Sequence, residues 1–175
     1  MKLDLLRHGV PIGGRIYRGN RDDPLSKKGW QQMLDSIQGK SWDYIASSPL
    51  IRCAKFAKYL SKNQTTRCEI FNNFKELDFG DWQGKSVDSI GQTLIDNFKL
   101  DPVNHRPLNA ENLYAFQARV LSSFKEIELH HTNELVLIVA HAGVIRVIKS
   151  YLLNLPIEKM FTIEVICASS EHFDF

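Results

Sequence analysis

The run Lys2–Gly9 places the strongest constraint on the fold, because it is largely apolar, lies next to the N-terminus and ends in glycine. Such a run is typical of a short buried strand followed by a sharp turn. Two basic side chains, Arg7 and His8, then lie where this strand ends. Ligands bind at the carboxyl ends of strands in open α/β sheets. Arg7 and His8 alone are more typical of an ordinary basic pair at a strand end.

Strand and helix patterns alternate along the chain, and two more basic residues follow strands. Arg52 comes after the expected strand Tyr44–Ser47, and His141 follows Leu135–Ala140, an apolar run typical of a central parallel strand. This alternation predicts an α/β fold, a three-layer α/β/α sandwich with a mainly parallel sheet. The other expected elements are strands at Glu69–Phe74 and Thr162–Ala168 and helices at Lys27–Gln38, Leu50–Lys62, Ser86–Phe98, Asn112–His131 and Val144–Leu153.

The composition predicts one domain over residues 1–175, because 43% hydrophobic residues are enough for one full core. No stretch approaches the roughly 18 apolar residues of a membrane span, and no signal-like run precedes the first strand, so neither membrane insertion nor secretion is expected. The cysteines, Cys53, Cys68 and Cys167, are odd in number and lie in apolar surroundings. We therefore expect buried free thiols and a cytoplasmic location.

Charge is distributed unevenly. The residues through Arg67 hold 13 Lys/Arg against 5 Asp/Glu, whereas the remainder holds 9 against 15. An excess of basic residues can indicate nucleic-acid binding, but here these residues are scattered and lack interleaved aromatic residues. A positive funnel for a small anionic substrate explains the asymmetry as well. We therefore expect a small-molecule partner and no nucleic acid.

A long loop, Val10–Pro24, follows the first expected strand and contains three glycines and two prolines. Loops of this length often carry function. We expect this loop to border the site, with Tyr17 and Arg18 as candidate substrate-binding residues.

The four residues Arg7, His8, Arg52 and His141 suit phosphoryl transfer if they converge. Guanidinium groups bind phosphate bidentately and stay charged. A neutral imidazole is a good nucleophile toward phosphorus, and nearby arginines lower the pKa of His8 and keep it neutral. His141 can take up a proton when a phosphate dianion arrives and then stabilise charge on the transferred group. Such a site needs no metal ion and no other cofactor.

The leaving alkoxide also needs a proton. Glu76 is the candidate donor, on a loop after the third expected strand, and the same residue could activate water afterwards. Asp78 and Asp81 compete for this role on sequence alone. The remaining histidines, His105, His130, His131 and His172, are expected to be exposed, and no cluster of Cys or carboxylates accompanies them to form a metal site.

Five motifs in order resemble the histidine phosphatase superfamily, in its phosphoglycerate-mutase-like branch. Leu6–Gly9 resembles the nucleophile motif, and Gly19–Gly29 is similar to the segment before the first helix. Ser47–Ala54, Glu76–Gly84 and His141–Arg146 resemble the phosphate-binding, acid-donor and second-histidine motifs. The resemblance covers residue 3 to about residue 150.

The resemblance implies a phosphoglycerate-mutase-like fold and a role for each site residue. His8 would be the nucleophile, Glu76 the proton donor, and Arg7, Arg52 and His141 the phosphate pocket. Mutases of this family carry an arginine pair for a second acidic group. Here an anionic second group is expected to meet Asp78 and Asp81, which disfavours mutase activity.

Within the family, the short chain, the Tyr17–Gly19 entry and the His141–Arg146 motif most resemble phosphatases of α-ribazole 5′-phosphate, an intermediate of cobalamin biosynthesis. Such a substrate has a benzimidazole-type base, for which Tyr17, Phe79 and Trp82 are possible stacking partners. A broad-specificity small-molecule phosphatase is the alternative. A silent binding module is disfavoured, because all five catalytic positions are filled. The sequence predicts no oligomeric state.

Overall fold

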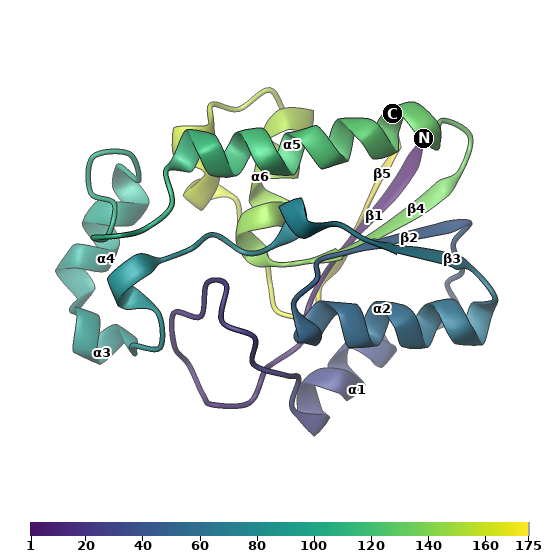
Figure 1. Cartoon of the computed structure of the whole chain (residues 1–175), viewed down its shortest axis with the longest axis horizontal. Coiled ribbons are helices and arrows are strands. Elements are labelled where there is room, and N and C mark those ends of the chain that lie inside the picture. Colours follow the sequence, from purple (N-terminus) through teal and green to yellow (C-terminus); the bar gives the residue numbers. More distant parts are fainter. Residues whose placement is uncertain (175) are drawn as a thin grey trace.

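The computed structural model describes residues 1–174 and contains one five-stranded sheet with helices on both faces (Figure 1). The strands are β1 (Lys2–Arg7), β2 (Tyr44–Ser47), β3 (Arg67–Ile70), β4 (Leu135–Ala140) and β5 (Ser170–Asp174). The helices are α1 (Lys27–Ser36), α2 (Ile51–Gln64), α3 (Val87–Ile90), α4 (Gln92–Leu100), α5 (Leu113–His130) and α6 (Ala142–Leu152), with short 3-10 turns η1 (Asn72–Phe74), η2 (Gly80–Trp82) and η3 (Ile157–Thr162).

The strand order is β3-β2-β4-β1-β5, and β4 therefore lies between β2 and β1. The pairs β1–β4, β4–β2 and β2–β3 are parallel, whereas β5 runs antiparallel to β1 at the edge. Four parallel strands therefore end side by side at the same edge of the sheet. The predicted three-layer α/β/α sandwich with a mainly parallel sheet is confirmed.

Each face of the sheet has its own apolar core. Helices α1 and α2 cover one face, where Met33 and Phe56 are fully buried. Helices α5 and α6 cover the other face, where Phe116 and Val144 are fully buried (Figure 1). Two covered faces explain why β4 is apolar throughout rather than alternating.

The turn after β1 packs tightly against the start of α1. Ser26 caps this helix by accepting a hydrogen bond from Gly29 N at 2.9 Å, as expected for an N-cap serine. A Cβ on Gly9 would approach Gly29 O to 2.0 Å, and a Cβ on Gly29 would approach Val10 O to 2.1 Å. Only glycine therefore allows the two backbones to lie this close, and their contact fixes the direction of the chain after His8.

Three element predictions are wrong in part. The expected helix Ser86–Phe98 is two helices, α3 and α4, because Gly91 has a φ of +96° that interrupts the helical path. The third strand lies at Arg67–Ile70 instead of Glu69–Phe74. The final strand is β5, whereas the expected strand Thr162–Ala168 has no strand conformation.

The three cysteines are free thiols, but only Cys53 is buried, and Cys68 and Cys167 are half-buried. Within residues 1–174, no helix combines the length and apolar character needed to cross a bilayer.

Candidate active site

Residues that follow three adjacent strands meet at one edge of the sheet. His8 follows β1, His141 follows β4 and Ser48 follows β2. The backbone continues the parallel ladder past the strand ends, since His8 N donates to Ala140 O and Ser48 N donates to Val139 O, both at 3.0 Å. The sheet thus brings the two predicted histidines together, with their ring centroids 5.1 Å apart.

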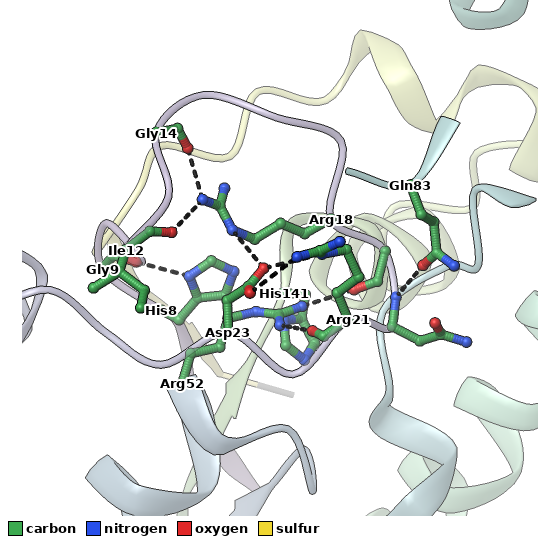
Figure 2. A network of polar contacts seen from close by, with 12 residues as sticks. His8, Gly9, Ile12, Gly14, Arg18, Arg21, Asp23, Arg52, Gln83 and His141 are labelled. Atoms are coloured by element: carbon green, nitrogen blue, oxygen red, sulfur yellow. Dashed lines mark hydrogen bonds and ion pairs between the residues drawn. The ribbon is translucent and has the colours of Figure 1, made fainter. Parts of the chain in front are cut away.

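The ring of His8 is fixed in one tautomer. Its Nδ1 lies 2.8 Å from Gly9 O, and because a carbonyl only accepts, Nδ1 carries the proton (Figure 2). The lone pair of Nε2 is therefore free. Burial, together with the charges of Arg52, Arg7 and Arg18, lowers the pKa of His8 to about 3. The free site thus holds a neutral imidazole.

Arg52 is buried beside His141 and anchors the loop Val10–Pro24. Its Nη2 donates to Gly19 O at 2.8 Å and its Nη1 to Arg21 O at 2.5 Å. Its Nε donates to His141 Nδ1 at 3.3 Å. One guanidinium group thereby ties the start of α2 to the loop and to the end of β4 (Figure 2).

His141 has the opposite tautomer from His8. Its Nδ1 accepts from Arg52, so its proton is on Nε2, which lies 2.6 Å from Ser48 Oγ and donates to it. The ring is fully buried. Burial first, and then the charge of Arg52, lowers the pKa of His141 well below its usual value.

Arg7 and Arg146 hold neighbouring carbonyls of the segment after η3. Arg7 Nη1 donates to Val165 O at 2.7 Å, and Arg146 Nε donates to Ile163 O at 3.0 Å. The Nε atom of Arg7 is buried and has no hydrogen-bond partner among residues 1–174.

Glu76 is buried at the N-terminal end of α6. Its Oε2 accepts from Gly143 N at 3.1 Å, and its Oε1 accepts from Leu77 N at 2.9 Å. The first turn of a helix leaves N–H groups unpaired and carries partial positive charge, so a carboxylate is stabilised there. Asp78 is engaged elsewhere, with Asn20 Nδ2 and Gly80 N, and Asp81 accepts from Asn109.

The loop Val10–Pro24 borders the site as expected, but Arg18 is largely committed to the loop itself. Arg18 Nη2 donates to Ile12 O at 2.6 Å and to Gly14 O at 2.7 Å, and its Nε lies 3.3 Å from Asp23 Oδ2 (Figure 2). The ring of Tyr17 packs edge-on against Phe79 and Trp82, at centroid distances of 5.1 and 5.4 Å.

A cavity of about 290 Å³ opens between these side chains. It is lined by Arg7, His8, Ile16, Tyr17, Arg18, Gly19, Arg52, Glu76, Leu77, Phe79, Lys99, Ala142, Gly143, Arg146, Met160 and Phe161. His141 packs edge-on against His8 and is not among the residues that line the cavity. Among the predicted stacking residues, Tyr17 and Phe79 line the cavity, whereas Trp82 is buried beneath Tyr17.

The expectation that a second anionic group would meet Asp78 and Asp81 is wrong. Neither residue lines the cavity, because both bind neighbouring loop segments, and Lys99 and Arg146 line it instead. Sequence reasoning also gave no role to Ser48, Gly143 or Phe161. The recognised motifs include Ser48, Gly143 and Arg146, so the sequence held a signal for these three residues. No motif contains Lys99 or Phe161, and the fold alone brings them to the cavity.

No group of three or more metal-ligating side chains that could hold an ion occurs within the described part of the chain. One of the four other histidines, His131, is not exposed as expected, because its ring stacks on Tyr44 at a centroid distance of 3.8 Å. His172 is exposed, although its Nδ1 lies 2.7 Å from the buried Asp4 carboxylate.

A profile of the histidine phosphatase superfamily (branch 1) matches residues 3–175. The adenosylcobalamin/alpha-ribazole phosphatase of Escherichia coli K12 is 28% identical over 94% of this chain and 85% of its own. Phosphoserine phosphatase 1 of Hydrogenobacter thermophilus is 26% identical over 93% of this chain and 81% of its own. The crystal structure of the alpha-ribazole phosphatase from Shigella flexneri superimposes with a TM-score of 0.82 at 25% identity, covering 99% of this chain and 90% of that one.

Proposed function

The chain belongs to branch 1 of the histidine phosphatase superfamily, and from this premise we propose that it hydrolyses small-molecule phosphate monoesters through a phosphohistidine at His8, without a metal ion. The observation that carries the proposal is the free Nε2 lone pair of His8 in a cavity that Arg7 and Arg52 also line. A neutral nucleophile beside two permanent cations is what attack on a phosphate dianion requires.

In the first step, His8 Nε2 attacks phosphorus and a P–N bond forms as the P–O bond to the leaving group breaks. Glu76, in its protonated form, transfers its proton to the leaving oxygen, so that an alcohol departs. The charge on the equatorial oxygens is balanced by Arg7 and Arg52. The unpartnered Nε of Arg7 supports this role, because a phosphate oxygen would satisfy it.

In the second step, the Glu76 carboxylate accepts a proton from water, and the oxygen of that water attacks phosphorus. The P–N bond breaks, and inorganic phosphate leaves together with the regenerated neutral His8. His141 contributes in both steps: once Arg52 Nε donates to the phosphate instead of to His141 Nδ1, that nitrogen can take up a proton as the dianion arrives, and the ring then stabilises the transferred group.

For the substrate, we propose α-ribazole 5′-phosphate, which would place the enzyme in cobalamin biosynthesis. Two similar proteins are alpha-ribazole phosphatases, and the aromatic rings of Tyr17 and Phe79 line the cavity beside the predicted phosphate site. Aromatic rings of this kind can stack on a benzimidazole-type base. A broad-specificity small-molecule phosphatase is the alternative. The free thiols support the proposal that the enzyme works in the reducing cytoplasm.

The decisive experiment measures phosphate release from α-ribazole 5′-phosphate in the presence of EDTA, with sugar phosphates, nucleotides and 3-phosphoglycerate as comparison substrates. We expect a kcat/KM several hundred-fold higher for α-ribazole 5′-phosphate. Similar slow rates on all esters would favour the broad-specificity phosphatase. Loss of activity in EDTA that a divalent ion restores would contradict the proposed metal independence. No phosphate release from any of these esters would contradict the proposed phosphatase activity.

A further inference from the structure

The five N–H donors of the Arg119 guanidinium group all reach acceptors, and three of these acceptors belong to the segment that carries Glu76. Nη1 donates to Asn73 O at 2.5 Å and to Lys75 O at 2.8 Å. Nη2 donates to Glu76 O at 3.2 Å. The remaining donors bind Glu111, with Nε donating to its Oε1 at 2.6 Å and Nη2 to its Oε2 at 2.8 Å. Arg119 does not line the cavity and has no part in the chemical steps proposed above.

Glu111 holds the chain just after Glu76. Its Oε2 accepts from Asp78 N at 3.3 Å, and its backbone N donates to Asp78 O at 3.0 Å. The ion pair between Arg119 and Glu111 is bidentate, and the two side chains are only 23% and 19% exposed. Bidentate pairs of this kind are strong and fix the relative orientation of the two groups. The Arg119–Glu111 pair therefore holds the backbone on both sides of Glu76.

Glu76 depends on such support, because residues 75–79 belong to no helix or strand. No ladder of backbone hydrogen bonds fixes this segment, yet the Glu76 carboxylate lies at one definite place, 3.1 Å from Gly143 N. Arg119 leaves α5 and Gly143 lies in α6, two helices on the same face of the sheet (Figure 1). The backbone of Glu76 is thus held from one helix and its carboxylate from the other.

An apolar contact connects Arg119 to the place where the carboxylate lies. The guanidinium carbon of Arg119 is 4.8 Å from the ring centroid of Phe116, which precedes it by one turn of α5. Phe116 is fully buried, and its Cζ lies 3.2 Å from the position that a Cβ on Gly143 would take. Arg119 therefore contacts both the backbone of Glu76 and the aromatic ring beside Gly143.

We infer that Arg119 and Glu111 are positioning residues for the acid step: they hold the backbone of Glu76 so that its carboxylate stays at Gly143 N beside the cavity. They act on proton transfer through Glu76 alone. This inference rests on the proposed phosphatase activity, but not on α-ribazole 5′-phosphate as the substrate. Arg7 and Arg52 bind phosphate from other elements, so loss of the pair should lower kcat and leave KM nearly unchanged.

The test measures the phosphorylation step by burst kinetics with two esters. One is the alkyl phosphate that wild-type enzyme hydrolyses fastest, whose leaving oxygen needs a proton. The other is p-nitrophenyl phosphate, whose leaving group departs as a stable anion. In Arg119→Met we expect the rate for the alkyl ester to fall about 10- to 100-fold, the scale of a misplaced reacting group, and the rate for p-nitrophenyl phosphate to change by a few-fold at most.

Two conservative variants test the geometry of the pair. Arg119→Lys keeps the charge but has three donors and no planar fork, so it should give the same pattern with a smaller loss. Glu111→Gln keeps the shape of the side chain and removes its charge, and should also lower the rate for the alkyl ester selectively. If Arg119→Met does not fold, these two variants decide the question.

A double variant separates positioning from general support of the fold. In the Glu76→Gln background, Arg119→Met should cause no further loss on the alkyl ester, because the residue through which Arg119 acts is already gone. The matched control is Lys149→Met, which removes another largely buried ion pair, Lys149 Nζ to Glu171 Oε2 at 2.5 Å, outside the cavity. This control should keep the wild-type ratio of the two rates.

Equal losses on both esters in the Arg119 and Glu111 variants would overturn the inference, since a merely structural role predicts that result. Unchanged rates, or a further loss in the Glu76→Gln background, would overturn it as well. In each of these cases wild-type enzyme still hydrolyses the esters and the proposed phosphatase stands. If wild-type enzyme hydrolysed no ester at all, the phosphatase itself would be rejected.

Discussion

The carboxylate of Glu76 accepts a hydrogen bond from Gly143 N at 3.1 Å, at a position where a Cβ on Gly143 would lie 2.2 Å from Glu76 Oε1. The absence of a side chain at Gly143 therefore makes room for the Glu76 carboxylate. It lets the acid reach the first turn of α6, where backbone N–H groups hold it next to the cavity. The two residues lie 67 positions apart in the sequence, in two different motifs, and act as one unit.

Replacement of Glu76 by glutamine should lower kcat according to the leaving group. For an alkyl phosphate, which needs a proton on its leaving oxygen, we expect a loss of about 100- to 10,000-fold. For p-nitrophenyl phosphate, whose leaving group departs as a stable anion, the loss in the phosphorylation step should be much smaller. Burst kinetics with both esters measure that step. Equal losses on both would show that Glu76 does not donate the proton.

Gly143→Ala should imitate the Glu76 variant while the protein stays folded. The added methyl group displaces the end of the Glu76 side chain, so the loss should again be larger for alkyl esters than for p-nitrophenyl phosphate. Gly39→Ala is a matched control, because no atom lies within 4 Å of its added Cβ, although its φ of +74° makes it mildly strained. Only stability should change in the control. Full activity of Gly143→Ala on alkyl esters would contradict the proposal that Gly143 positions the Glu76 carboxylate.

Ser48→Ala should disturb His141 without touching His8. Loss of the hydroxyl leaves the buried Nε2–H of His141 without its acceptor, which costs about 1–3 kcal/mol. We expect kcat/KM to fall about 10-fold and the ¹⁵N shifts of the His141 ring to move. Ser47→Ala is the control, since Ser47 is equally buried but its hydroxyl donates to the backbone carbonyl of Ser48. Unchanged ring shifts in Ser48→Ala would contradict this tautomer assignment.

The low pKa of His8 predicts acid destabilisation of the free enzyme. The unfolded chain binds a proton at His8 below the ordinary pKa of 6.5, whereas the folded protein does so only near 3. Unfolding therefore takes up a proton in this range, and the free energy of unfolding falls as the pH is lowered from about 6.5 toward 3. Buried His141 acts in the same direction.

The measurement is the midpoint temperature of unfolding between pH 7 and pH 4 for wild-type protein and His8→Gln. The variant should lose less stability over this range. His130→Gln, which removes an exposed histidine, should follow the wild type. A His8→Gln curve parallel to the wild-type curve would rule out a neutral buried His8.

The sequence predicted the centre of the fold well, because apolar runs specify buried parallel strands. The strands at Tyr44–Ser47 and Leu135–Ala140 are confirmed residue for residue, and their polar neighbours meet as expected. The strand at the antiparallel edge of the sheet was harder to predict. Residues Thr162–Ala168 have the β-branched pattern of a strand, yet the carbonyls of Ile163 and Val165 accept from arginine side chains. The polar run Ser170–Asp174 pairs with β1 instead.

Convergence of the predicted site was foreseeable for the same reason, since His8 and His141 follow adjacent strands. The hydrogen-bond partners of the site residues could not be predicted from the sequence. That Arg18 serves the loop and Arg52 ties three segments together depends on distances that only folding sets. Lys99 gave no sequence signal, because it reaches the cavity from α4, which packs outside the sheet region (Figure 1).

The anchoring of the loop at its two ends has a practical consequence for engineering. On one side, Ile12 N binds Pro24 O, and on the other, Arg52 holds the carbonyls of Gly19 and Arg21. The tip between them, residues 13–16, touches the cavity through Ile16 and carries none of the proposed catalytic groups. The length and composition of this tip can therefore be varied in a library to change which esters enter the cavity. The proposed catalytic groups should keep their geometry in such variants.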